Sequence, residues 1–196
     1  MDHISVLRTH ITGRKPFIVG IGGTTKTHST SENALRECLG MVEAQGIETR
    51  IFCAEDLDLP MYRYDPGNRT GAVAELVTAL RRCTGLVISS PAYHGSIPGL
   101  IKNALDYIED LNGDARPYLD GRAVGCIVSA SGVQALGTTL VSLRMIIHSL
   151  RGWPTPYGAV INSETAPFDK TGACTDDSVR RQLAIVAKQV SEFVSV

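Results

Sequence analysis

The feature that most constrains the fold is a regular alternation, along the whole chain, between short apolar runs and longer amphipathic segments. Short apolar runs predict buried strands, and segments with hydrophobic residues every three or four positions predict helices. Near the end of the chain, for instance, Leu183, Val186 and Val190 have the helical spacing. The predicted strands are 17–21, 47–53, 85–89, 123–129 and 157–162, and the predicted helices are 31–45, 70–83, 98–111, 137–150 and 175–194.

Strands that alternate with helices indicate a parallel sheet covered by helices on both faces. Crossovers between parallel strands are right-handed, which for five strands favours the doubly wound order 2-1-3-4-5. The expected fold class is therefore α/β, a three-layer sandwich whose ligand crevice lies at the carboxyl ends of the first and third strands. A chain of 196 residues with 43% hydrophobic and 20% charged residues suits a single domain, 1–196, that begins with a leader of 1–15.

The loop after the first predicted strand, 22–31, is rich in small hydroxylated residues. Where such a loop runs into a helix N-terminus, hydroxyls, backbone N–H groups and the helix dipole converge, and this arrangement binds phosphate. The motif Gly-x-x-x-x-Gly-Lys-Ser/Thr is absent, which argues against a triphosphate hydrolase, and the motif Gly-x-Gly-x-x-Gly is absent as well. The alternative is that 29–31 only caps the helix, with Glu32 in its first turn. The candidate phosphate ligands are Thr24, Lys26, Ser29 and Ser31, followed by Thr25 and Thr30.

The loop after the third predicted strand begins at Pro91 and ends where Pro98 opens the next helix. Its small residues leave backbone N–H groups uncovered, and a proline needs no donor in the first helical turn. The main chain of this loop can therefore lie flat against a planar ligand. Because the two loops follow neighbouring parallel strands, they predict a nucleotide-type site between them.

Together these loops resemble those of the flavin mononucleotide reductase family of flavodoxin-like proteins, which includes NAD(P)H-dependent flavin, quinone, azo-dye and chromate reductases. Residues 91–106, with Lys102 and Asn103, match the family pattern Pro-x-Tyr-x-Gly-Ser-x-Pro-Gly-x-x-Lys-Asn-x-x-Asp. Residues 23–29 match the pattern Gly-Ser/Thr-x-Arg-x-x-Ser, except that Lys26 stands where the family has arginine. A point charge replaces a bidentate fork there, and phosphate binding should survive the change. The resemblance covers most of the chain and implies a flavodoxin-like fold.

The resemblance also implies that a flavin ring lies against the second loop, where backbone N–H donors face its N5 and its carbonyl oxygens. The alternative for Tyr93 and His94 is a surface aromatic and a solvated histidine. A third loop, 129–134, would pass along the pyrimidine edge, although Val133 and Gln134 stand where the family has a glycine pair. The implied ring contacts are Pro91, Ala92, Tyr93, His94, Gly95 and Ser96 in the second loop, with the N–H groups of 93–96 as donors, and Ser129, Ser131 and Gly132 in the third.

By the same resemblance the chain is an oxidoreductase with FMN as cofactor, NADPH or NADH as hydride donor and a flavin, quinone or similar small molecule as electron acceptor. The flavin carries the chemistry, so we expect neither a catalytic side chain nor a metal. The segment 56–66 resembles the family's edge of the substrate pocket, and an ordinary surface loop is the alternative. Two other functions remain open: an FMN-dependent dehydrogenase of a small cyclic metabolite in a biosynthetic pathway, and an electron carrier of the flavodoxin type.

Composition argues against several other classes. The net charge of −1 gives no field that would attract nucleic acid, and no basic stripe with interleaved aromatics is present. No apolar run reaches the roughly 18 residues of a membrane span, and the first residues lack the pattern of a signal peptide, so we expect a cytoplasmic protein. The 5 cysteines are scattered without a Cys-x-x-Cys pair, which predicts buried thiols rather than a zinc site or disulfides.

Two predicted helices carry more apolar residues than one covered face requires. We therefore expect a second copy of the chain to bury the surplus, as a homodimer or homotetramer, and relatives in the family imply the same. The alternative is that both helices are more deeply buried within one subunit. The apolar residues are Leu100, Ile101, Ala104, Leu105, Ile108 and Leu111 in 98–111, and Leu140, Val141, Leu143, Met145, Ile146 and Ile147 in 137–150.

Overall fold

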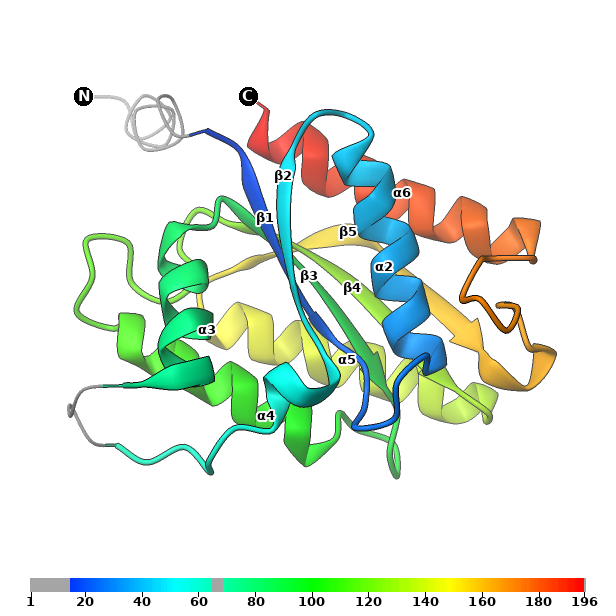
Figure 1. Cartoon of the computed structure of the whole chain (residues 1–196), viewed down its shortest axis with the longest axis horizontal. Coiled ribbons are helices and arrows are strands. Elements are labelled where there is room, and N and C mark those ends of the chain that lie inside the picture. Colours follow the sequence, from blue (N-terminus) through cyan, green and yellow to red (C-terminus); the bar gives the residue numbers. More distant parts are fainter. Residues whose placement is uncertain (1–14, 65–68, 196) are drawn as a thin grey trace.

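The computed structural model describes residues 15–64 and 69–195, and a five-stranded parallel sheet in the order β2-β1-β3-β4-β5 forms its centre (Figure 1). The predicted fold class and strand order are confirmed. Most of the predicted leader, 1–14, lies outside the described residues. The strands are β1 (Phe17–Gly22), β2 (Glu48–Phe52), β3 (Gly85–Pro91), β4 (Ala123–Ala130) and β5 (Trp153–Asn162).

Helices cover both faces of the sheet (Figure 1). Alternate strand residues point to opposite faces, so Val19 of β1 packs in one core and Ile18 in the other. One core is closed by α2 (Thr30–Glu43) and α6 (Asp177–Val194). The other is closed by α3 (Gly71–Arg82), α4 (Gly99–Asp106) and α5 (Val133–Ser149). Three short 3₁₀ turns, η1 (Ala54–Leu57), η2 (Tyr107–Leu111) and η3 (Ser163–Thr165), complete the described elements.

Two elements begin four residues earlier than the sequence predicts. The helix α5 begins at Val133, directly after Gly132, so the third loop shortens to Ser131 and Gly132. Strand β5 begins at Trp153 rather than at 157, although it contains two prolines. Both prolines are tolerated because β5 lies at the edge of the sheet, where backbone N–H groups on one side have no strand to pair with.

Most of the apolar surplus predicted for 98–111 does not reach the surface, and Leu100 alone of that set is partly exposed. In the structure α4 is followed by η2, and Ile101, Leu105, Ile108 and Leu111 are all buried within the subunit. The prediction that they need a second copy to cover them was therefore wrong, because they belong to the hydrophobic core of the chain itself. On α5, Val141 and Met145 are 60% and 61% exposed, so apolar surface does lie open there, and its burial by a second copy stays a prediction.

Within the described residues, no helix is both long and apolar enough to span a membrane.

Candidate functional site

The carboxyl ends of β1 and β3 lie side by side, and the first two predicted loops leave from them. Gly22 is paired in register with Ser89, and the Gly23 N–H donates to the Ser89 carbonyl at 3.2 Å. The Ser89 hydroxyl in turn donates to the Ser31 carbonyl at 2.7 Å, which ties β3 to the start of α2. The structure therefore brings the two loops together at the predicted switch point of the sheet.

Within the first loop, side chains hold the backbone in a fixed shape. The Thr24 hydroxyl accepts from the Lys26 N–H at 3.0 Å and donates to the Lys26 carbonyl at 3.1 Å. The Ser29 hydroxyl caps α2 by accepting from the Glu32 N–H at 3.3 Å, and it lies 3.3 Å from the Ser31 hydroxyl. The capping role considered from the sequence is therefore present, and it leaves both hydroxyls grouped at the helix N-terminus.

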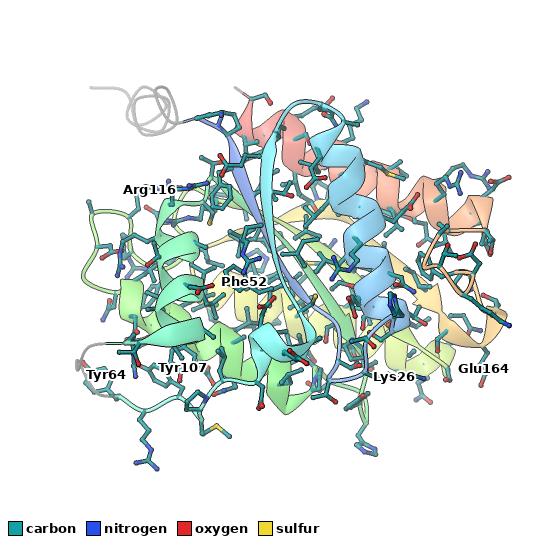
Figure 2. The ribbon with its side chains drawn as sticks, viewed as in Figure 1. Lys26, Phe52, Tyr64, Tyr107, Arg116 and Glu164 are labelled. Carbon is teal, nitrogen blue, oxygen red and sulfur yellow. The ribbon has the colours of Figure 1, made fainter. Side chains whose placement is uncertain are left out.

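Several backbone donors of this loop remain free. The N–H groups of Ser29, Thr30 and Ser31 have no acceptor among residues 15–64 and 69–195. They lie at the positive end of the α2 dipole, where an anion is stabilised. The side chain of Lys26 is exposed, and Figure 2 shows it at the carboxyl end of the sheet beside the start of α2. Thr25 is exposed on the same loop.

The second loop contains a tight two-residue turn. The Tyr93 N–H donates to the Ser96 carbonyl at 2.9 Å, and the Ser96 N–H donates back to the Tyr93 carbonyl at 3.2 Å. Between them His94 and Gly95 both have positive φ, 55° and 83°, which defines a type I′ turn. The expectation that all four N–H groups face a ligand is thus corrected, because the turn itself uses those of Tyr93 and Ser96.

The two central N–H groups of this turn, those of His94 and Gly95, have no acceptor within the described part of the chain. Before the turn, Pro91 ends β3 and is buried, and the Ala92 N–H donates to the Ser129 carbonyl of β4 at 2.8 Å. The Tyr93 side chain is 53% exposed. A planar ligand would therefore meet two free donors next to an accessible aromatic ring.

The third loop lies beside the second, because β4 is the neighbour of β3. Ser129 is buried near the end of β4, whereas Ser131 and Gly132 are exposed. The Ser131 hydroxyl lies 3.3 Å from the Ser163 hydroxyl, which follows β5. All three predicted loops thus border one edge of the sheet, in the order first, second, third.

Sequence reasoning gave no ligand-site role to two polar residues beneath the first loop, Glu32 and Asn33, which are both buried. The Glu32 carboxylate accepts from the His28 N–H at 2.9 Å and from Arg36 Nε at 2.9 Å. Burial raises the pKa of the adjacent Cys53 thiol to about 11, and the Glu32 carboxylate adds to that shift. Cys53 is thus a protonated, structural thiol at neutral pH. In the sequence, an acid directly after a polar loop and at the third position of the predicted capping box is the signal that points to this cluster.

Among the described residues, no group of three or more His, Cys, Asp or Glu side chains could hold a metal ion. The arrangement offers backbone donors, hydroxyls and one exposed amine instead.

The sequence of residues 16–166 matches the profile of a family described as NADPH-dependent FMN reductase. The chain belongs to this family. An FMN-dependent azoreductase using NADPH from Staphylococcus haemolyticus is 28% identical over 185 residues, which cover 89% of this chain and 93% of the relative. The NADPH-dependent FMN reductase ArsH of Shigella flexneri is 26% identical over 174 residues, 89% of this chain and 67% of the relative. The predicted oxidoreductase with FMN and NAD(P)H is therefore confirmed at the level of the family.

The fold is also similar to that of solved flavoenzymes. The solved structure of FerB, an NAD(P)H:acceptor oxidoreductase from Paracoccus denitrificans, superposes with a TM-score of 0.71 at 19% identity, covering 92% of this chain and 97% of that one. At this identity the likeness concerns the fold alone.

The residues of the first and second loops, at the switch point of the sheet, fit FMN. The first loop offers free N–H groups at a helix N-terminus, which suit a terminal phosphate. The second loop offers two free N–H groups on a rigid turn, which suit the polar edge of a flavin ring. Donors suited to a phosphate and donors suited to a flavin edge thus lie on neighbouring loops.

Proposed function

We propose that the first loop holds the FMN phosphate and that the type I′ turn of the second loop holds the flavin ring. The observation that carries this proposal is the juxtaposition of free donors on two loops that a direct hydrogen bond, Gly23 to Ser89, ties together. The proposed phosphate ligands are the N–H groups and hydroxyls of Ser29, Thr30 and Ser31, with Thr24, Thr25 and Lys26. The proposed ring contacts are Pro91, Ala92, Tyr93, His94, Gly95, Ser96, Ser129, Ser131 and Gly132.

When bound, FMN supplies a centre that accepts hydride from NAD(P)H and releases electrons to a second substrate. The chain itself binds, orients and polarises. The fixed N–H dipoles of His94 and Gly95 would stabilise negative charge that develops on the adjacent edge of the ring. Neither dipole has to reorganise during the reaction, because the hydrogen bonds between Tyr93 and Ser96 lock the turn.

We further propose that the electron acceptor is a flavin, a quinone or a similar flat molecule that stacks on an open ring face. No tryptophan or tyrosine occurs in 129–137, the segment that contains the third loop and the start of α5, to cover the ring. A flavodoxin-type carrier usually encloses its ring between aromatics, so this segment favours an enzyme. A dehydrogenase of a small metabolite would keep the same loops and differ in which molecule reduces the flavin.

Calorimetry with FMN, FAD and riboflavin tests the phosphate assignment. FMN should bind more tightly than riboflavin, and equal affinities would refute the assignment. Lys26→Ala should weaken FMN by about 1.5 to 3 kcal/mol, the value of one charge-assisted contact, and should leave riboflavin unchanged. Lys188→Ala is the matched control, since Lys188 is a well-exposed lysine on α6 paired with Glu192. An unchanged FMN affinity in Lys26→Ala would remove Lys26 from the site.

We propose that a second copy of the chain covers the exposed side of α5, most simply across a two-fold axis, giving a homodimer or a tetramer of such dimers. Val141 and Met145 are exposed there, and Met145 also lines a groove of about 430 Å³ between α4 and α5. Sedimentation should show a species larger than 21.0 kDa, and Met145→Glu should split it. A monomer at micromolar concentration would contradict this. A cytoplasmic location, where NAD(P)H is supplied, remains a prediction.

A further inference from the structure

One residue of the first loop, His28, has a left-handed backbone conformation with φ of 57°. This region is unfavourable for any residue with a Cβ, because the Cβ crowds the carbonyl oxygen. Glycine is the usual residue where a loop needs such a turn, and this chain has histidine instead. Neighbouring groups must therefore stabilise the conformation of His28.

Two side chains from the first turn of α2 bind the main chain of His28 at both ends. The Glu32 carboxylate accepts from the His28 N–H at 2.9 Å, and the Asn33 amide donates to the His28 carbonyl at 3.3 Å. Both side chains are buried, with exposed fractions of 3% and 5%. Two buried side chains thus hold the N–H and the carbonyl of His28.

The pattern differs from an ordinary capping box in one respect. In a capping box, the acid at the third helical position accepts from the N–H of the N-cap residue. Here the N-cap is Ser29, yet Glu32 accepts from His28, one residue earlier. The Ser29 N–H therefore stays free, next to the free N–H groups of Thr30 and Ser31.

The position of the Glu32 carboxylate is itself fixed from the opposite side. Arg36 donates from Nε to Glu32 Oε1 at 2.9 Å, and the thiol of Cys53, the residue directly after β2, lies 3.6 Å from the same oxygen. Arg36 also compensates the negative charge, which would otherwise oppose a phosphate a few residues away. This network joins the first loop to α2 and to β2.

We propose that Glu32 and Asn33 are positioning residues that preset the first loop for a terminal phosphate by holding His28 in its left-handed conformation. The inference depends on the proposed phosphate role of this loop. In this proposal Glu32 does not contact the cofactor. Its effect is to leave three consecutive N–H groups, those of residues 29 to 31, available to one anion.

The test compares FMN with riboflavin in variants of the full chain, by fluorescence titration of each flavin. Glu32→Ala removes the acceptor for His28 and should raise the Kd for FMN about tenfold, while the Kd for riboflavin changes by less than about twofold. Glu32→Gln keeps an acceptor oxygen and should restore the FMN Kd to within about threefold of the original protein. Glu37→Ala, which removes an acid of α2 that pairs with Arg180 of α6, is the matched control.

A second variant keeps the inference testable if Glu32→Ala does not fold. Asn33→Asp preserves the shape of the side chain but replaces the donor to His28 with an acceptor, so it should also weaken FMN more than riboflavin. Equal losses for the two flavins, or no loss for FMN, would overturn the positioning role. If the original protein itself binds FMN and riboflavin equally, the proposed phosphate site fails instead, and the two failures are thereby distinguished.

Discussion

Gly22→Ala tests whether the close approach of β1 and β3 builds the site. A Cβ placed at Gly22 would lie 2.9 Å from Ser89 Cβ and 3.1 Å from the Ser89 carbonyl carbon, and closer still to the carbonyl oxygen. Carbon atoms in good contact are about 3.5 to 4.0 Å apart, so the two strands must separate by several tenths of an ångström. The same carbonyl oxygen accepts the Gly23 N–H, so this hydrogen bond must lengthen as well.

The expected loss in the free energy of unfolding follows from these two effects. Overpacking a dense interior costs about 1 to 3 kcal/mol, and loss of one buried hydrogen bond costs about 0.5 to 1.5 kcal/mol. We expect Gly22→Ala to lower the free energy of unfolding by about 2 to 4 kcal/mol, measured by urea denaturation at constant m-value. FMN affinity should fall too, because Gly23 begins the first loop.

The matched control is Gly40→Ala. Gly40 is in α2, and a Cβ there would meet no atom within 4 Å. Alanine favours a helix over glycine, so this variant should gain about 0.5 to 1 kcal/mol. A loss below about 0.5 kcal/mol for Gly22→Ala, within the range of neutral surface substitutions, would refute the argument from strand contact.

Three further outcomes are expected. Arg122 is buried at the opposite end of the sheet and donates to four backbone carbonyls. Calorimetry of Arg122→Met should therefore show that the free energy of unfolding falls by about 3 kcal/mol or more, while FMN affinity is retained. A fall below about 1 kcal/mol would contradict this prediction. Burial raises the pKa of the Cys38 and Cys126 thiols to about 12, above the value of about 8.5 in an unfolded chain. The free energy of unfolding that the protonated thiols contribute should therefore decline from about pH 9 upward. Replacing both cysteines with alanine should flatten that decline. Asn103 donates to the carbonyls of Leu59 and Pro60 and accepts from the Tyr62 N–H. Asn103→Leu should therefore expose the 59–62 segment to proteolysis while riboflavin affinity persists. Unchanged cleavage would count against this role of Asn103.

The sheet order and the three loops could be predicted because they depend on patterns that are local in sequence. Apolar runs identify strands, and right-handed crossovers leave few ways to order five of them. The resemblance at 91–106 then indicated the cofactor. These are properties that a single sequence displays directly.

What could not be predicted depends on partners distant in the chain. The start of β5 was missed because Pro154 and Pro156 look like loop residues until the strand is known to be at an edge. The burial of Ile108 depends on how η2 is covered by other elements. The sequence of the turn at His94 and Gly95 does not tell which of its N–H groups are already hydrogen-bonded within the turn, because that depends on the turn type that the structure shows.

The central claim is that this chain holds FMN at the switch point of its sheet and that a nicotinamide cofactor reduces it there. The most direct measurement mixes the FMN-loaded protein with NADPH or NADH under anaerobic stopped-flow conditions and follows the flavin absorbance. We expect rapid bleaching by at least one of the two, with electrons then passed to a quinone or to free flavin in ping-pong kinetics. Bound flavin that neither nicotinamide bleaches, but that a small metabolite does, would contradict the proposed reductase and identify the chain as a dehydrogenase of that metabolite.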